Sequence, residues 1–336
     1  MKRIAINGFG RIGRAALKII IDTPDLEIIA VNDLMSIENA AYLLKYDSIY
    51  GKYENEVFVR GNQLNIRDRE ILFIAEKDPV KLPWKNLDID VVIESTGLFT
   101  NREDAEKHIR AGAKTVILSG PTKSVDTPTV VHGVNNQDGK TKIFSCASCT
   151  TNNIAPIMEI LDRRVGIKKA ILNTVHAYTA SQNLIDGASR KKPRMGRAAA
   201  INLIPASTGA ATAAIKALPQ LEGKFDGIAI RTPVPVGSIS DITFITARRT
   251  TVEEINNILL DESTTDRYKF VLAVSDEPMV SSDIVKSSFA SIVDLDMTRV
   301  VDGDLVKILA WYDNEWGFTN QMIRQIQYQI SDKEIG

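Results

Sequence analysis

The sequence predicts an α/β protein of two domains, the first built on a parallel sheet and the second on a mixed, largely antiparallel sheet. The chain has 336 residues, of which 44% are hydrophobic, and single hydrophobic cores stop growing at about 250 to 300 residues. Its first third alternates short β-branched runs with helical patterns, which is typical of a parallel sheet with crossover helices. Later apolar runs are longer, and they indicate a different kind of sheet.

The individual elements follow from the spacing of apolar residues. In the first region we expect strands over 3–7, 27–32, 90–95 and 115–119, and helices over 11–21 and 103–111. In the second region we expect strands over 170–176, 227–231 and 241–247, a hairpin around Asp302-Gly303-Asp304, and a helix capped by Thr251 with Glu254. We place the first domain at 1–148, completed by a C-terminal helix over 315–336, and the second domain at 149–314.

Composition excludes several classes of partner. Lys plus Arg is 41 and Asp plus Glu is 42, so the net charge of -1 provides no overall attraction for a nucleic acid. The basic N-terminus is followed by an apolar stretch that Asn7 and Gly8 interrupt, and no run of about 18 apolar residues occurs. We therefore expect a soluble, cytoplasmic protein with no membrane partner. The two cysteines and three histidines form no recognisable zinc spacing, so we expect no metal.

A glycine motif predicts a dinucleotide site. The segment Gly8-Phe9-Gly10-Arg11-Ile12-Gly13 follows a predicted strand and opens a predicted helix. Gly8 permits a tight turn, Gly10 lets a pyrophosphate approach the backbone, and Gly13 allows close helix packing. Asp33 ends the second strand, where it can accept hydrogen bonds from ribose hydroxyls. The alternative is a glycine-rich turn of another α/β domain, which the register of strand, helix and acidic residue disfavours. The first domain is therefore predicted to be a Rossmann-type NAD(P)-binding domain.

One cysteine stands where a nucleophile would be activated. Cys149 lies at the start of a predicted helix, where the helix dipole and a nearby imidazole would lower the thiol pKa. His176, at the end of a strand, suits that role better than His108 or His132. Spacing alone leaves the pairing open, because a cysteine is more often a buried small hydrophobe. Cys146 forms a Cys-x-x-Cys pair with Cys149, but such a redox motif normally belongs to a compact single domain. We hypothesise that Cys146 makes the site sensitive to oxidation.

Along essentially its whole length the chain resembles the glyceraldehyde-3-phosphate dehydrogenase family. The matching segments are 6–14, 32–33, 44–48, 147–152 and 311–315. The resemblance implies an α+β catalytic domain in which Cys149 adds to the aldehyde of glyceraldehyde 3-phosphate and His176 takes the proton. Hydride then passes to the nicotinamide, and inorganic phosphate releases 1,3-bisphosphoglycerate. The resemblance also implies a homotetramer, with the segment 180–201 crossing to a neighbouring subunit.

The resemblance assigns further site residues position by position. The residues implied for the substrate and phosphate sites are Ser148, Thr150, Thr179, Arg197, Thr208, Gly209 and Arg231. Those implied for the cofactor are Gly8, Gly10, Arg11, Ile12, Gly13, Asp33, Lys77, Ser119 and Asn314, the last at the nicotinamide carboxamide. Hydroxyls, backbone amides and an arginine fork are suitable phosphate ligands.

Cofactor choice and substrate keep alternatives open. Asp33 would repel a 2′-phosphate and favours NAD, yet Ala188-Ser189 resembles forms that accept both cofactors, and Lys77 could pair with the added phosphate. We expect NAD first, with NADP tolerated. Erythrose-4-phosphate dehydrogenase shares the Cys-His pair, but the segment 176–179, with Thr179, favours the triose enzyme. A redox-sensing or adhesive protein on this fold is a further alternative, since a fold does not fix function.

Overall fold

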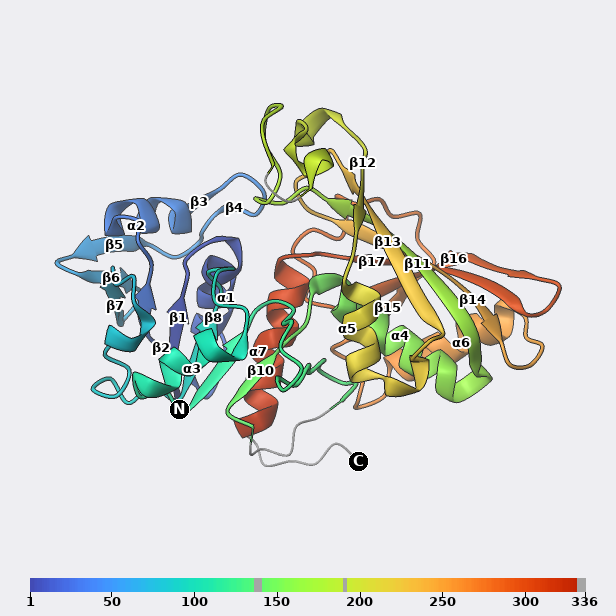
Figure 1. Cartoon of the computed structure of the whole chain (residues 1–336), viewed down its shortest axis with the longest axis horizontal. Helices are drawn as coiled ribbons and strands as arrows, with labels where there is room; N and C mark the ends of the chain where they lie inside the picture. Colours follow the sequence, from blue (N-terminus) through green and yellow to red (C-terminus); the bar gives the residue numbers. More distant parts are fainter. Residues whose placement is uncertain (136–140, 190–191, 331–336) are drawn as a thin grey trace. The chain divides into compact units, whose positions relative to one another are not determined.

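The computed structural model describes residues 1–135, 141–189 and 192–330, and it divides into two compact units (Figure 1). Unit 1 comprises Met1–Val130, Gln137–Ala147 and Met322–Gly336, and unit 2 comprises Val131–Asn136 and Ser148–Gln321. The boundary at Ala147 and Ser148 lies within two residues of Cys149. The C-terminal helix α7 (Trp316–Ile330) begins in unit 2, and its residues from Met322 onward belong to unit 1.

The sheet of unit 1 has the strand order β10-β9-β8-β1-β2-β7-β6-β5. Its parallel strands are β1 (Lys2–Asn7), β2 (Leu26–Asn32), β7 (Arg69–Ile74), β8 (Val91–Glu94), β9 (Thr115–Leu118) and β10 (Ile143–Ser145). The helices are α1 (Arg11–Ile21), α2 (Ile37–Lys45) and α3 (Arg102–Arg110). The predicted parallel sheet is thus confirmed. Strand β1 lies between β2 and β8, and the carboxyl ends of strands around such a point form a crevice in this fold class.

An antiparallel extension of this sheet was absent from the sequence prediction. The strands β5 (Val57–Arg60) and β6 (Gln63–Ile66) pair antiparallel with each other, and β6 pairs antiparallel with β7. These strands are short, and β5 alternates half-buried with exposed residues, so periodicity gave little signal. A two-residue ladder, β3 (Tyr46–Asp47) with β4 (Gly51–Lys52), lies outside the main sheet.

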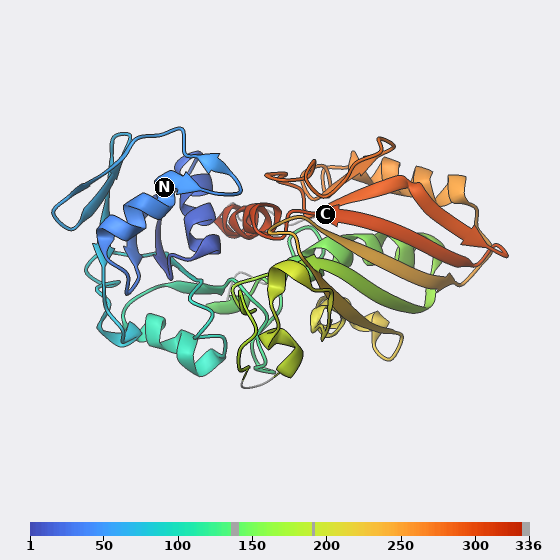
Figure 2. The same ribbon diagram turned by 90° about the horizontal axis from the view of Figure 1, so that it is seen from above.

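The sheet of unit 2 has the order β12-β13-β11-β14-β17-β16-β15 and is mixed but mostly antiparallel, as predicted. Its strands are β11 (Ile167–Ala177), β12 (Ile204–Ser207), β13 (Phe225–Thr232), β14 (Ser238–Thr246), β15 (Leu272–Ser275), β16 (Ser291–Val301) and β17 (Leu305–Tyr312). The helices α4 (Cys149–Val165), α5 (Ala210–Ala217) and α6 (Val252–Ser263) pack against it, and Figure 2 shows α4 and α6 along one face.

The other face of this sheet exposes apolar side chains. Residues alternate between faces along a strand, so Leu172 is fully buried while Ile171 is 59% exposed. Ile228 on the neighbouring β13 lies on the same face as Ile171 and is 52% exposed. Two β-branched apolar side chains therefore face solvent on this side of the sheet.

Two local predictions of the second region hold. The hairpin between β16 and β17 turns at Asp302 and Gly303, which both have positive φ, as a tight hairpin turn requires. Thr251 caps α6, because its hydroxyl accepts from the Glu254 N–H at 3.1 Å. The Glu254 carboxylate binds Arg248 rather than closing a capping box. Within the described ranges, no helix has the length and apolar character needed to cross a membrane.

Candidate active site

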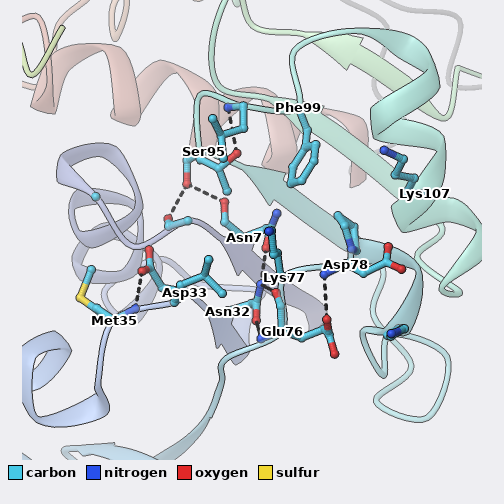
Figure 3. Close-up of a pocket in the computed structure, with 17 residues that line it drawn as sticks. Asn7, Asn32, Asp33, Met35, Glu76, Lys77, Asp78, Ser95, Phe99 and Lys107 are labelled. Atoms are coloured by element: carbon cyan, nitrogen blue, oxygen red, sulfur yellow. Dashed lines mark hydrogen bonds between the residues drawn. The ribbon is translucent and has the colours of Figure 1, made fainter.

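A cavity of about 810 Å³ opens at the carboxyl ends of the central strands of unit 1 (Figure 3). Its lining includes residues at the carboxyl ends of three strands: Asn7 and Gly8 at the end of β1, Asn32 and Asp33 at the end of β2, and Ser95 and Thr96 after β8. Strand β1 therefore meets its two neighbours at the floor of the cavity. The volume lies in the range of small-molecule and cofactor sites.

The three motif glycines have distinct reasons to lack a side chain. Gly8 has φ +96°, and a Cβ there would lie 2.5 Å from the Thr96 nitrogen. A Cβ on Gly13 would lie 2.1 Å from the Gly8 carbonyl oxygen. A Cβ on Gly10 would meet nothing within 4 Å, although Gly10 lines the cavity. Gly8 and Gly13 are thus required by the turn, whereas Gly10 keeps open the space that a pyrophosphate would take.

Asp33 is held rigidly at this cavity. Its Oδ2 accepts from the Phe9 N–H at 2.6 Å and its Oδ1 accepts from the Met35 N–H at 3.0 Å; Figure 3 shows the contact with Met35. The remaining carboxylate lone pairs can accept hydrogen bonds from ribose hydroxyls, and the negative charge of Asp33 would repel a 2′-phosphate. Lys77 lines the same cavity and supplies a cation near it. These residues fit a bound dinucleotide.

Some of the predicted cofactor residues do not belong to the cavity lining that the described residues form. In the described part of the chain the lining does not include Arg11, Ile12, Gly13 or Ser119. Arg11 opens α1, but its Nη1 lies 2.6 Å from the Asp47 carboxylate, so the guanidinium is already engaged. Its backbone N–H, in the first turn of the helix, is the group that can face an anion.

A buried polar chain beneath the cavity was missed by the sequence reasoning. Asn7 donates to Glu94 at 2.6 Å and accepts from Asn32 at 2.7 Å. Glu94 also lies 3.1 Å from Nε2 of His108, a residue that is fully buried. The Trp84 indole N–H donates to His108 Nδ1 at 3.0 Å, so the imidazole proton is on Nε2, facing Glu94. The position of Asn7 and Asn32 at strand ends was the only available signal.

In unit 2, Cys149 is the first residue of α4. Ser148 is the N-cap, with its hydroxyl accepting from the Thr151 N–H at 3.0 Å. Ala147 precedes it with φ 60°, a left-handed conformation that costs a non-glycine residue about 1 to 2 kcal/mol. The thiol is half-buried, and the backbone N–H groups of Cys149 and Thr150 hydrogen-bond to it.

The imidazole of His176 lies beside this thiol. Nε2 of His176 is 3.4 Å from Sγ of Cys149, and the ring is 4% exposed. Nδ1 lies 2.7 Å from the Ala177 carbonyl oxygen and 2.6 Å from Nη1 of Arg231. The Tyr312 ring packs against the imidazole in a T-shaped arrangement, with 6.0 Å between ring centroids. The structure therefore brings together the cysteine, histidine and arginine that the sequence singled out.

The pKa shifts at this pair differ from our expectation. Burial lowers the pKa of His176 to about 3, and the neighbouring Arg231 charge acts in the same direction. Burial raises the pKa of the Cys149 thiol, although Arg231 and the Thr150 hydroxyl oppose the shift. The expected lowering of the thiol pKa is therefore wrong in sign for this arrangement, because desolvation of the thiolate outweighs the favourable charges and dipoles.

The candidate phosphate ligands gather around two helix starts. Thr151 in the first turn of α4 donates to the Ala210 carbonyl at 3.4 Å, so α4 and α5 begin side by side. Gly209 is the N-cap of α5, and the Thr208 hydroxyl accepts from the Ala210 N–H at 3.1 Å. Thr179 follows β11 and its hydroxyl contacts Ser181 at 2.8 Å. Two adjacent helix N-termini provide several N–H donors for an anion.

Three further residues have other partners. Arg197 is exposed and pairs with Asp186 at 2.8 Å. The Thr150 hydroxyl lies 2.9 Å from the Tyr312 hydroxyl. Asn314 is buried, and its Oδ1 accepts from the Gly237 N–H and the Ser238 hydroxyl, each at 3.1 Å. These two donors fix the orientation of the Asn314 amide.

Cys146 is a buried thiol. It is 3% exposed, and burial raises its pKa strongly. A protonated, inaccessible thiol is a poor nucleophile, which argues against our hypothesis of an oxidation-sensitive Cys146. Among the described residues, no group of three or more His, Cys, Asp or Glu side chains could hold a metal ion.

Comparisons with known proteins cover both units. Residues 2–102 match the family described as "Glyceraldehyde 3-phosphate dehydrogenase, NAD binding domain", and residues 148–314 match its C-terminal domain. The chain is 45% identical to a glyceraldehyde-3-phosphate dehydrogenase of Clostridium pasteurianum, with 98% of each chain covered. It is 48% identical to that of Thermotoga maritima, covering 97% of this chain and 98% of the relative. It is 46% identical to that of Zymomonas mobilis, covering 96% of both.

Proposed function

The chain belongs to the glyceraldehyde-3-phosphate dehydrogenase family, and from this premise we propose that it oxidises glyceraldehyde 3-phosphate to 1,3-bisphosphoglycerate with inorganic phosphate. It is an NAD-dependent oxidoreductase that acts on an aldehyde. The observation that carries the proposal is the 3.4 Å contact between Cys149 Sγ and His176 Nε2 at the start of a helix.

The chemistry divides between the sulfur and the imidazole. Cys149 Sγ bonds to the aldehyde carbon as its proton passes to Nε2 of His176, and the imidazolium gives that proton to the aldehyde oxygen, which yields a thiohemiacetal and a neutral imidazole. His176 then takes the proton of that hydroxyl while the carbon loses hydride, for which a bound NAD would supply the acceptor. The backbone N–H of Cys149 and the protonated imidazole stabilise the charge on the oxygen. An oxygen of inorganic phosphate attacks the thioester carbon, and the Cys149 sulfur leaves.

Two anion sites follow from the ligands around the sulfur. We assign the substrate phosphate to Thr179 and Arg231, whose fork can bind it bidentately. We assign the inorganic phosphate to the paired helix starts of α4 and α5, through Ser148, Thr208 and Gly209. Thr150 and Arg197 are assigned with them, and Arg197 would then exchange its present partner Asp186 for phosphate.

The cofactor residues are assigned in the same way. Gly8, Gly10, Asp33 and Lys77 line the cavity of unit 1. The backbones of Arg11, Ile12 and Gly13 would face the pyrophosphate, and Asn314 would bind the nicotinamide carboxamide. Ser119 is assigned to the cofactor with them. We propose that NAD is preferred and NADP tolerated. A ratio of kcat/KM above about a thousandfold in favour of NAD, or about 4 kcal/mol, would exclude dual use.

A spectrophotometric assay tests the function. Reduction of NAD should require both glyceraldehyde 3-phosphate and phosphate, and it should be slower with erythrose 4-phosphate. Cys149→Ala should abolish turnover, whereas the matched variant Cys146→Ala should retain it, because Cys146 is buried away from solvent. Full turnover by Cys149→Ala, or a higher kcat/KM for erythrose 4-phosphate, would overturn the assignment.

We also propose a cytoplasmic homotetramer. The open face of the unit 2 sheet carries Ile171 and Ile228, and the segment after β11 exposes four further apolar residues, Leu184, Ile185, Ile201 and Leu203. A second copy of the chain would remove this apolar area from water. Light scattering should give about four times the chain mass of 37.1 kDa. Ile228→Lys should shift this mass downward, and an unchanged mass would contradict the proposed interface.

A further inference from the structure

The ring nitrogens of His176 face partners that cannot all be satisfied at once. Nδ1 lies 2.7 Å from the Ala177 carbonyl oxygen and 2.6 Å from Nη1 of Arg231. A carbonyl oxygen only accepts, so that contact requires a proton on Nδ1. A guanidinium only donates, so the other contact requires Nδ1 without a proton. Arg231 Nη1 also donates to the same Ala177 oxygen at 3.0 Å, which places it between the two.

The two tautomers differ in what they can do for Cys149. When Arg231 donates to Nδ1, the single proton of the neutral ring is on Nε2, which faces Sγ. Such a ring could give up that proton only by becoming an imidazolate anion. Its Nε2 also has no lone pair with which to accept the Cys149 proton. When Nδ1 instead donates to the Ala177 oxygen, Nε2 has a lone pair toward the sulfur. Only the second tautomer can act as base and then as acid.

We propose that Arg231 is a positioning residue that holds His176 in the unreactive tautomer until a phosphate group of the substrate draws the guanidinium away from Nδ1. The inference rests on the proposed function, in which Arg231 binds that phosphate. It adds a second task to this side chain. The phosphate would then activate the base as well as anchor the substrate.

The present position of Arg231 leaves it incompletely satisfied. Its Nε is buried and has no hydrogen-bond partner among the described residues. A phosphate dianion offers oxygens to both Nε and a terminal nitrogen, which is the arrangement a guanidinium favours. The Arg231 charge also contributes to the lowered pKa of His176, so its withdrawal would make the ring more basic.

The change needs only a proton exchange. His176 is 4% exposed and the Tyr312 ring packs against it, so the imidazole can stay in place. The Nε2 proton passes to water, Nδ1 takes one proton from water, and the neutral ring keeps its charge. Nε2 is then free to accept the Cys149 proton.

Nitrogen-15 NMR of histidine-labelled protein reads the tautomer directly. The probe is glycerol 3-phosphate, a three-carbon phosphomonoester without an aldehyde, so no turnover occurs. We expect His176 Nδ1 to be unprotonated without the probe and protonated when the probe saturates the site. The chain has three histidines, and His176→Asn identifies the signals of this one. His108 is an internal reference, because Trp84 donates to its Nδ1 and the probe should not change it.

Two variants separate the roles of the phosphate ligands. Arg231→Met should show a protonated Nδ1 even without the probe. Thr179→Val, which alters the phosphate site without touching the imidazole, should keep the wild-type tautomer and require more probe to change it. A protonated Nδ1 in the wild type without probe, or no change at saturation, would overturn the inference. If Arg231→Met does not fold, the wild-type titration decides alone.

The result is independent of the assay of function. If the wild type oxidises glyceraldehyde 3-phosphate but its tautomer does not respond to the probe, the inference fails and the proposed function stands. If the tautomer responds but glyceraldehyde 3-phosphate is not oxidised, the substrate assignment fails while the link between Arg231 and a phosphate group stands.

Discussion

Substituting the third motif glycine should damage the fold itself. In Gly13→Ala the new Cβ would lie 2.1 Å from the Gly8 carbonyl oxygen, so the two must separate by roughly 1 Å. Gly8 is held by its N–H to the Asn32 oxygen at 2.8 Å and by the Ser95 hydroxyl on its own oxygen at 2.7 Å. Overpacking costs about 1 to 3 kcal/mol, and each weakened hydrogen bond about 1 kcal/mol. We expect a loss of about 3 to 5 kcal/mol in the free energy of unfolding.

Gly10→Ala is the matched control, because it adds the same methyl group three residues earlier in the same glycine motif. Its Cβ meets nothing within 4 Å, and φ of -70° suits alanine, so the free energy of unfolding should change by less than about 1 kcal/mol. The methyl group would instead occupy the pyrophosphate space and raise the KM for NAD at least about tenfold, or 1.4 kcal/mol. Urea unfolding at one protein concentration and steady-state kinetics measure the two effects. Equal stability of both variants, or a wild-type KM in Gly10→Ala, would refute the reasoning.

Three further predictions concern buried groups. Cys149→Ser should lower kcat at least about 10³-fold, and His176→Asn should lower it about 10² to 10⁴-fold. The KM for NAD should be unchanged in both variants, and a smaller loss of kcat in either would contradict the role of that residue. The pKa of His176 is about 3 in the folded chain and 6.5 in the unfolded chain. Between pH 6.5 and 5 the unfolded chain therefore binds a proton that the folded chain does not, and the free energy of unfolding should fall by about 2 kcal/mol. Urea titrations should show this loss in the wild type and not in His176→Asn; identical pH dependence would exclude it. Trp84→Phe should lower the free energy of unfolding by about 1 to 3 kcal/mol, because it leaves the buried Nδ1 of His108 without its hydrogen-bond donor. An unchanged Tm would contradict that hydrogen bond.

Strong periodicity made much of the fold predictable. The first helix was expected over 11–21 and is α1 (Arg11–Ile21), because a glycine turn fixes its start and apolar residues repeat at helical spacing. The hairpin at Asp302 and Gly303 was predictable from turn chemistry. The strands β5 (Val57–Arg60) and β6 (Gln63–Ile66) were not, since their pairing with β7 decides their state and four residues carry too little pattern.

The candidate site was predictable where chemistry is local. Cys149 was expected at the start of a helix, and it is the first residue of α4, with Ser148 as the N-cap. The sign of the thiol pKa shift was not predictable, because desolvation depends on what packs over the sulfur. The approach of Arg231 to His176 depends on the parallel pairing of β13 with β11, which places these two residues opposite each other in the register. No spacing in the sequence shows that pairing.

The polar chain from Trp84 through His108 and Glu94 to Asn7 constrains how this chain can vary. Each member uses a donor or acceptor that the next one needs, so changing one leaves a buried polar group of its neighbour without a hydrogen-bond partner. Substitutions at these positions should be tolerated in combination and rejected singly. A mutant library that randomises the four positions together should therefore contain folded sequences that cannot be reached by one substitution at a time, because the single variants on the way would not fold.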